Sequence, residues 1–156
     1  MEATKTLRNP RATGMAWITP ILIVRDIDKE IDFCKRAFGL EKGITMPDKT
    51  GKSVHGELKY ENETIVMFGR EGAMGCPVKS PATTNADCPI ALYVYCPNVD
   101  ELYKRAKAAG ATVVSEPKDQ FWGDRTVSFK DPEGYGWMFA TNVGEFDPSK
   151  IPEEWK

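Results

Sequence analysis

The sequence is poor in the residues that mark several common classes of protein. It contains a single histidine among 156 residues, and its four cysteines form no Cys-x-x-Cys pair. A structural zinc site needs about four such ligands at regular spacing, so the sequence predicts none and we expect reduced thiols. The longest apolar run, residues 18–24, is far too short to cross a bilayer.

The balance of charged residues argues against a nucleic acid as the partner. The chain has 21 Lys and Arg residues against 23 Asp and Glu residues, so it lacks the basic excess that nucleic-acid binding requires. Residues 1–17 contain no apolar stretch of the kind that forms a secretory signal. We therefore expect a cytoplasmic protein that has neither a nucleic acid nor a membrane as its partner.

The chain repeats itself at a distance of 71 to 72 residues. Residues 21–39 and 92–110 both read as a β-branched or aromatic strand, a helix cap, and a helix that ends at glycine. Further on, residues 58–68 align with residues 129–139. Each half thus reads as a strand, a helix and two or three further strands. The sequence predicts an α+β fold of two tandem βαβββ modules.

The modules have recognisable boundaries. We expect the first to span residues 17–69 and the second residues 89–143, with a linker at 70–88 that is rich in Gly, Pro, Ala and Thr. Residues 1–16 would form a flexible N-terminal segment, and residues 144–156 a C-terminal tail.

Both predicted helices have a good N-cap and an apolar stripe. Asp26 and Asn98 stand at equivalent points before the two helices, and both residue types cap helices well. The apolar residues that recur at helical spacing should pack on the sheets; they are Ile27, Ile31, Cys34 and Phe38 in the first helix, and Val99, Leu102, Tyr103 and Ala106 in the second.

The turn at residues 131–134, Asp-Pro-Glu-Gly, fixes which side chains share a face of its hairpin. A three-residue loop with a glycine would pair Asp131 with Tyr135. Val127, Phe129, Trp137 and Phe139 then point toward the helix, and Thr126, Ser128, Gly136 and Met138 point away. The same loop at residues 60–64 would place Val54, Gly56 and Leu58 toward the helix, with His55, Glu57 and Lys59 on the opposite face beside Met67.

That opposite face is either solvent-exposed or the inside of a cavity. Two such modules side by side can curl their sheets into an open cup with the helices outside. The cup would then contain His55, Glu57, Tyr93 and Tyr95. Because a concave surface with aromatic walls and a few polar groups is the usual small-molecule site, the tyrosines favour a cavity.

Trp122, Asp124 and Arg125, which lie just before or at the start of the last hairpin, could form the mouth of this cup. Exposure of Trp122 to water beside Phe121 would be unfavourable, so Trp122 is expected to contact other groups. Arg125 would offer a positive charge to a ligand. Asp124 and Arg125 would also be explained by an exposed ion pair.

The paired modules, with "VRDIDKEIDFCKRAFG", "FWGDR" and "FKDPEGYGWMFAT", resemble the vicinal oxygen chelate superfamily. This group includes glyoxalase I, extradiol dioxygenases, and the fosfomycin- and bleomycin-resistance proteins. "VHGEL" and the Trp-Gly-Asp segment are most similar to the PhnB-like and bleomycin-resistance-like branch. The resemblance covers residues 17–143 and implies a homodimer, in which modules pair within one chain or swap between two.

The same resemblance predicts that the standard metal site is absent. Metal-dependent members have His and Glu at four positions, which here hold Thr19, Met67, Ala91 and Met138. These side chains cannot supply the imidazole and carboxylate ligands that a divalent ion needs. We therefore expect no cofactor, and we expect these four residues to contact a ligand, with the two methionines as an adaptable apolar floor.

His55 and Glu57 remain open to three interpretations. They could be part of a non-standard divalent metal site, a polar wall of a metal-free binding cup, or a purely structural pair.

Two functions follow from the sequence. The first is a metal-free protein that binds a small planar or aromatic molecule through Tyr93, Tyr95, Trp122, Arg125 and Ser128. The second is an enzyme of glyoxalase or isomerase type, or a dioxygenase, with His55 as base and Glu57 as orienting or acidic group. Arg125 would then bind an anionic substrate. Loss of the standard ligands favours the first function.

Overall fold

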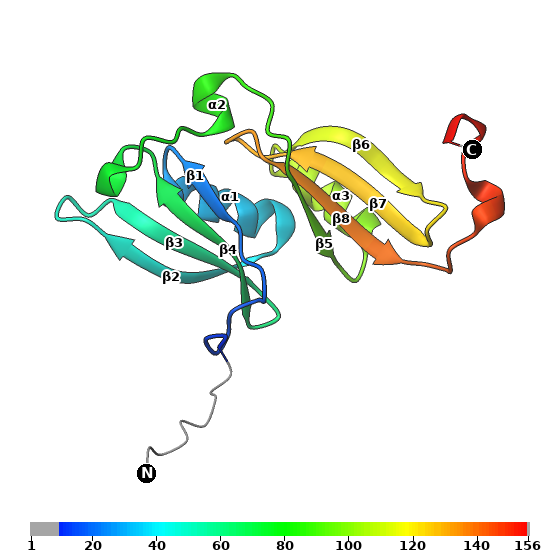
Figure 1. Cartoon of the computed structure of the whole chain (residues 1–156), viewed down its shortest axis with the longest axis horizontal. Helices are drawn as coiled ribbons and strands as arrows, with labels where there is room; N and C mark the ends of the chain where they lie inside the picture. Colours follow the sequence, from blue (N-terminus) through cyan, green and yellow to red (C-terminus); the bar gives the residue numbers. More distant parts are fainter. Residues whose placement is uncertain (1–9, 156) are drawn as a thin grey trace, which may run out of the picture.

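Two sheets of four strands form the body of the molecule (Figure 1), which is a computed structural model that describes residues 10–155. Residues 1–9 of the predicted flexible segment lie outside the described residues. The first sheet has the order β1-β4-β3-β2, and the second has the order β5-β8-β7-β6. The strands are β1 Ile21–Val24, β2 Glu41–Pro47, β3 Ser53–Tyr60, β4 Glu63–Arg70, β5 Ala91–Tyr95, β6 Thr112–Asp119, β7 Asp124–Lys130 and β8 Gly136–Asn142.

The two sheets have the same internal pairing. In each sheet the first strand is parallel to the last, and the other neighbours are antiparallel. This identity confirms the predicted α+β fold and its two βαβββ modules.

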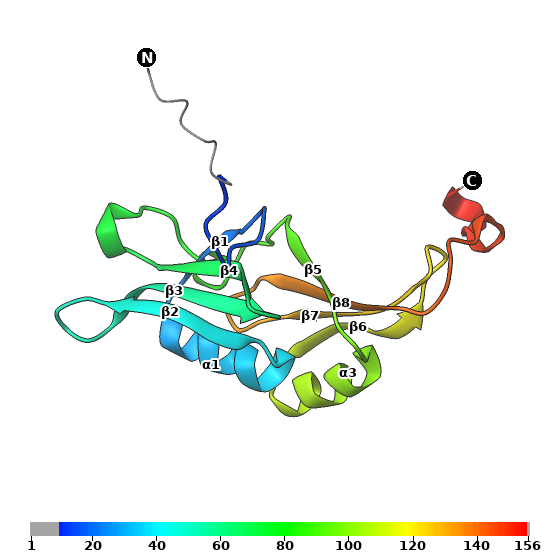
Figure 2. The same cartoon turned by 90° about the horizontal axis from the view of Figure 1, so that it is seen from below.

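The helices α1 (Ile27–Phe38) and α3 (Val99–Ala108) lie on the same side of the two sheets (Figure 2). Both predicted caps are confirmed, because Asp26 and Asn98 each accept backbone hydrogen bonds from the first turn of their helix. No helix among residues 10–155 packs on the opposite faces of the sheets, which are called the open faces. None of the described helices is long and apolar enough to span a membrane.

The hydrophobic core lies between the helices and the sheets. The stripe residues Ile27, Ile31, Cys34 and Phe38 are at most 3% exposed, as predicted. In the second module Val99, Leu102 and Ala106 are buried, Tyr103 is half-buried, and the hairpin residues Val127, Phe129, Trp137 and Phe139 are at most 1% exposed.

One residue joins the two halves of this core. Phe38 is the last residue of α1, and its ring centroid lies 5.2 Å from that of Trp137 and 4.8 Å from that of Phe139, both on β8. The first module therefore inserts an aromatic ring into the core of the second.

The turn at residues 131–134 has the predicted form. The Asp131 backbone N–H donates to the Tyr135 carbonyl at 3.0 Å, and Gly134 has φ +90°, a conformation that glycine adopts without steric cost. The Asp131 carboxylate also accepts from the Trp137 indole at 2.8 Å.

The equivalent loop of the first module was predicted wrongly. It has two residues rather than three, Glu61 and Asn62, with φ +46° and +69°. Positive φ at both positions is the two-residue hairpin turn that follows the strand twist, and asparagine tolerates it. A β-bulge just after Leu58 compensates for the shorter loop, so Glu57 still pairs with Met67 on the open face as predicted.

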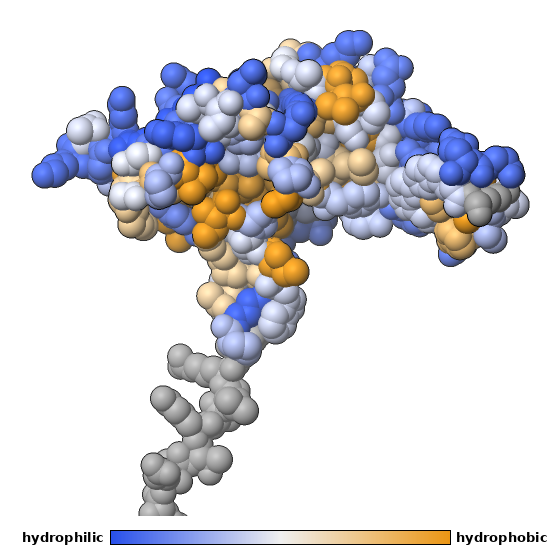
Figure 3. Space-filling view, turned by 45° about the horizontal axis from the view of Figure 1, so that its top comes forward, coloured by the Kyte–Doolittle hydropathy of each residue, from blue (hydrophilic) through white to orange (hydrophobic). Residues whose placement is uncertain are grey.

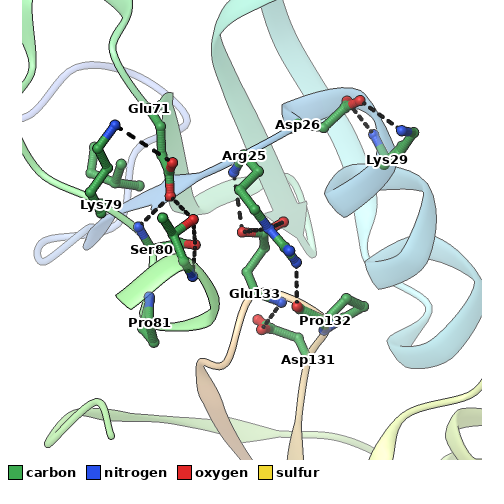
Figure 4. Close-up of polar contacts among 12 residues, drawn as sticks. Arg25, Asp26, Lys29, Glu71, Lys79, Ser80, Pro81, Asp131, Pro132 and Glu133 are labelled. Carbon is green, nitrogen blue, oxygen red and sulfur yellow. Dashed lines mark hydrogen bonds and ion pairs between the residues drawn. The ribbon is translucent and has the colours of Figure 1, made fainter. Parts of the chain in front are cut away.

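The modules are clamped together where β1 meets the 131–134 turn (Figure 4). The Arg25 backbone N–H and guanidinium donate to the buried Glu133 carboxylate at 3.1 and 3.2 Å, and Arg25 also donates to the Pro132 carbonyl at 2.8 Å. The Tyr135 hydroxyl donates to the Ile23 carbonyl at 2.8 Å. This clamp fixes how the two open faces lie relative to one another.

The segment between the modules contributes to the same junction. It contains a 3-10 turn, η1 (Ala73–Gly75), and a short helix, α2 (Pro81–Thr84), that lies against the clamp. Ala82 N–H donates to the Glu133 carbonyl at 2.9 Å, and Glu71 accepts from the Ser80 backbone at 2.6 Å. The linker is thus hydrogen-bonded to the turn of the second module.

The C-terminal tail forms two 3-10 turns, η2 (Pro148–Lys150) and η3 (Glu153–Trp155). It lies beside the loop that precedes β7, because the Asp147 N–H donates to the Phe121 carbonyl at 2.8 Å. The Phe121 ring also contacts that of Trp155, with centroids 5.7 Å apart.

Candidate functional site

The open face of the second sheet presents two tyrosines from β5. Side chains alternate along a strand, so Leu92 and Val94 turn toward the helix side while Tyr93 and Tyr95 turn to the open face. The two tyrosines are 44% and 56% exposed, and their rings meet edge to face with centroids 5.6 Å apart. They form an exposed aromatic surface.

A buried carboxylate lies under this surface. Asp124, the first residue of β7, is 3% exposed and accepts hydrogen bonds from the Tyr93 hydroxyl at 2.7 Å and the Tyr95 hydroxyl at 2.9 Å. The Asn142 amide donates to its other oxygen at 3.0 Å, and the Trp122 indole donates to the Tyr93 hydroxyl at 3.3 Å. Three predicted ligand contacts, Tyr93, Tyr95 and Trp122, thus meet around one carboxylate.

These contacts fix the protonation states of the group. Burial alone would raise the pKa of Asp124, but the hydrogen bonds from Tyr93, Asn142 and Tyr95 lower it below its ordinary value. Burial and the bond to Asp124 raise the pKa of Tyr93 to about 12. At neutral pH the carboxylate is therefore ionised, and both tyrosines keep their protons.

Arg125 does not join this group. As the neighbour of Asp124 in β7 it turns to the helix side of the sheet, where it donates to Asp100 at 2.8 and 2.9 Å and to Asp119 at 2.8 Å. Its guanidinium connects β7 to the first turn of α3 and the end of β6. The same alternation puts Asp124, Thr126 and Ser128 on the open face.

The methionine and serine of the predicted site lie in one row with a tyrosine. Tyr93, Met138 and Ser128 are direct partners across the adjacent strands β5, β8 and β7. All three therefore share the open face, and an apolar side chain separates the tyrosine from the serine hydroxyl.

A groove of about 330 Å³ runs beside β5, between the two modules. Its other wall consists of Ala16, Ile18 and Pro20, which precede β1, together with residues from the β3–β4 hairpin. Ile18 in this wall is 87% exposed, and its chain neighbour Trp17 is 72% exposed. In Figure 3 hydrophobic residues gather where the N-terminal segment joins the body of the molecule.

The open face of the first sheet carries the predicted His55–Glu57 pair. The His55 Nε2 lies 3.5 Å from the Glu57 Oε1, and the Thr64 hydroxyl donates to the other carboxylate oxygen at 3.1 Å. Glu57 is 9% exposed and has room because Gly43 has no side chain, since a Cβ there would lie 2.8 Å from the Glu57 Cβ. The pair has the geometry of an oriented carboxylate beside an imidazole.

The four positions that the resemblance assigns to metal ligands hold side chains that do not suit a metal ion. The Thr19 hydroxyl lies 3.4 Å from the Thr64 carbonyl, Met67 pairs with Ile21, and Ala91 pairs with Gly136. A hydroxyl, a methyl group and the thioethers of Met67 and Met138 are poor ligands for the divalent ions of such chemistry. Within residues 10–155 no three His, Cys, Asp or Glu side chains converge as a metal site would require.

These features accompany a clear family relationship. The chain belongs to the glyoxalase/bleomycin resistance protein/dioxygenase superfamily, whose family model matches residues 14–139. It is 33% identical over 135 residues to uncharacterized proteins of Mycobacterium bovis and Mycobacterium tuberculosis, covering 86% of this chain and 88% and 79% of theirs.

Solved structures show the same fold. TioX from Micromonospora sp. ML1 is 27% identical, with a TM-score of 0.64 over 85% of this chain and all of TioX. A glyoxalase/bleomycin resistance protein/dioxygenase from Nocardioides is 16% identical, with a TM-score of 0.61 over 91% of both chains. The resemblance predicted from the sequence is thereby confirmed for the superfamily.

Proposed function

We propose that this protein binds a small planar or aromatic molecule without the help of a metal ion. The observation that carries the proposal is the exposed pair Tyr93 and Tyr95 beside an apolar groove, at a place where the superfamily's metal ligands are replaced by poor ones. A concave, mostly apolar surface with a few fixed polar groups is the usual form of such a site. The row of Met138 and Ser128 extends it.

The groove is open to solvent in a single chain, and we infer that a second copy covers it. Ile18, which lines the groove, and its chain neighbour Trp17 would otherwise keep large apolar surfaces in water, which is typical of an interaction site. The protein is therefore proposed to be a homodimer. Its four cysteines are free thiols, which suits the reducing cytoplasm that the sequence predicts.

Replacing Tyr95 by Ala tests the binding site. Base or ring stacking on an aromatic side chain contributes roughly 1–3 kcal/mol, so the variant should bind planar dyes at least about fivefold more weakly in a fluorescence titration. Val114→Ala is the control, since it removes an exposed apolar side chain from β6. Equal affinity of both variants for every dye would contradict the proposal.

Elemental analysis of untagged protein prepared without chelator tests the metal-free part of the proposal. We expect folded protein with less than stoichiometric divalent metal. A stoichiometric metal would show that the chain holds an ion through other residues, with His55 and Glu57 as the first to replace.

A second function, an enzyme of glyoxalase or isomerase type, is favoured by one observation. Glu57 is oriented by Thr64 and lies 3.5 Å from His55, as a base and its partner would. Arg125 would take no part, because Asp100 and Asp119 occupy its guanidinium. If this function is correct, His55→Ala abolishes turnover of any substrate found, whereas in the binding protein it only weakens affinity. Equal rates in variant and wild type would exclude the enzyme as assigned.

A further inference from the structure

The polar group under the tyrosines has a fixed direction of hydrogen bonding. Asp124 is ionised and accepts from both hydroxyls, so the protons of Tyr93 and Tyr95 point down to the carboxylate. The hydroxyl oxygens then present lone pairs to anything that lies on the open face. The Trp122 indole already donates to Tyr93, which shows how such a lone pair is used.

Among the described residues no Lys or Arg forms a hydrogen bond or an ion pair with Asp124. Two lysines share the open face, Lys118 beside Thr126 on the edge strand β6 and Lys130 paired with Asp87, and neither contacts the carboxylate.

The neighbouring Arg125 lies on the other side of the sheet between two carboxylates, and the third polar partner of Asp124 is the neutral amide of Asn142. No Lys or Arg is among the described residues that line the adjacent groove. Because apolar surroundings screen charge poorly, the negative potential of the carboxylate extends to the surface over Tyr93 and Tyr95, next to this groove.

From these observations we propose that the open face at Tyr93 and Tyr95, beside the groove, selects planar molecules that carry N–H donors or a positive charge, and rejects those that present only acceptors or a negative charge. This deepens the proposed function and rests on it. The Tyr95 hydroxyl accepts the donor, the ionised Asp124 stabilises a cation through both hydroxyls, and the exposed ring faces attract a delocalised cation. Protonated amino-heteroaromatic compounds have this combination of features.

Three acridines of nearly the same size test the selectivity at pH 8. 9-Aminoacridine is a cation with N–H donors, acridine is neutral with only an acceptor nitrogen, and acridine-9-carboxylate is an anion. Their own fluorescence reports binding to the full chain. We expect 9-aminoacridine to bind about tenfold more tightly than acridine, a difference of about 1.4 kcal/mol, and acridine-9-carboxylate to bind most weakly.

Different results of this comparison would exclude the selectivity alone and the proposed function as a whole. Equal affinity for all three acridines, or tightest binding of the carboxylate, would overturn the selectivity while leaving a planar-molecule binding protein. No binding of any acridine would overturn the proposed function and the selectivity together.

Two variants locate the selectivity. Tyr95→Phe removes one acceptor and should reduce the affinity for 9-aminoacridine about tenfold, while the affinity for acridine changes by less than about a factor of two. Tyr103→Phe is the matched control, because that hydroxyl also donates to a carboxylate, Glu116, but on the helix side. Equal effects of the two substitutions would overturn the assignment to Tyr95.

Asp124→Asn keeps the shape of the buried group but removes its charge. It should reduce the preference for 9-aminoacridine over acridine-9-carboxylate at least about tenfold. Circular dichroism and thermal melting verify that the variant is folded, and Tyr95→Phe gives an independent answer if it is not. A folded variant with the wild-type preference would overturn the role of the carboxylate.

Discussion

A buried glutamate on α1 shows what a single residue contributes to this molecule. Glu30 is 2% exposed and interacts with the carboxyl group of Asp131 at the junction of the two modules. Burial and the negative charge of Asp131 raise the pKa of Glu30 to about 9. Glu133 adds to the negative charge, and the Cys34 thiol donates to Glu30. Glu30 is therefore protonated in the folded protein at neutral pH.

This shift predicts a pH dependence with a definite sign. A glutamate in the unfolded chain has a pKa near 4.5, so between that value and about 9 the folded state binds one more proton than the unfolded state. The contribution of Glu30 to stability is complete at low pH and is lost as the pH rises through this window. The slope cannot exceed about 1.4 kcal/mol per pH unit for one group.

Glu30→Gln should remove that slope, because an amide cannot ionise. Urea denaturation between pH 5.5 and 9 should show a free energy of unfolding that depends less on pH than in wild type, with the variant the more stable protein at pH 8. Glu101→Gln, at an exposed site of α3, is the control. Parallel curves for Glu30→Gln and wild type would contradict the assigned pKa.

At the scale of elements, α1 holds the two modules together through its last turn. The Phe38 ring packs on three aromatic rings of the second module, and Arg105 of α3 donates to the Ala37 carbonyl at the helix end at 3.2 Å. The elements of one module are therefore stabilised by those of the other.

Phe38→Ala should destabilise the whole protein by roughly 3–5 kcal/mol, the usual cost of removing a buried aromatic ring. Because the ring lies between modules, denaturation should remain a single transition that moves to lower urea. Phe146→Ala, at a position 56% exposed in the C-terminal tail, should cost less than about 1 kcal/mol. A loss confined to one of two separate transitions would show that the modules unfold independently.

The elements also show which features a sequence reveals. Caps, the helix stripes and the 131–134 turn depend on residues close in the chain, so they were predictable. The loop of the first hairpin was not predictable, because two arrangements place Glu57 on the same face of the sheet. One is a three-residue loop without a bulge, and the other is a two-residue turn with a bulge just after Leu58. Strand alternation could have separated Asp124 from Arg125, since Val127 and Phe129 were already assigned to the helix side.

Contacts across modules could not be predicted in this way. Arg25 and Glu133 are 108 residues apart, and no local pattern connects them. The central role of Asp124 also depends on Tyr93 and Tyr95 coming from a strand about 30 residues earlier, and Asn142 from a strand 18 residues later. The open-face positions of Tyr93 and Tyr95, by contrast, agree with simple strand alternation, and those of His55 and Glu57 agree with the prediction because the bulge compensates for the shorter loop.

At the scale of the whole molecule, the proposed dimer is tested by charge at the groove. Ile18→Asp places a carboxylate at a position that is 87% exposed, so it should leave the folded chain intact while opposing burial of that surface. Light scattering after size-exclusion chromatography should give a dimer for wild type and a monomer for the variant. Ile44→Asp, on the edge strand β2 and 61% exposed, should remain dimeric.

The opposite result, in which Ile44→Asp dissociates the dimer and Ile18→Asp does not, would place the contact at the far edge of the first sheet. A monomeric wild-type protein at all concentrations would contradict the dimer itself.

The contacts across the shared core also distinguish the two halves of the chain from one another. By the 72-residue offset of the helix caps Asp26 and Asn98, the position that corresponds to Phe38 in the second module is Gly110, and the position that corresponds to Arg105 in the first is Phe33. Two identical half-length chains paired by a twofold axis would have to make each contact twice. The ring supplied by one half and the guanidinium supplied by the other are each used once, so the two halves of this chain are not interchangeable and neither could replace the other by pairing with a copy of itself.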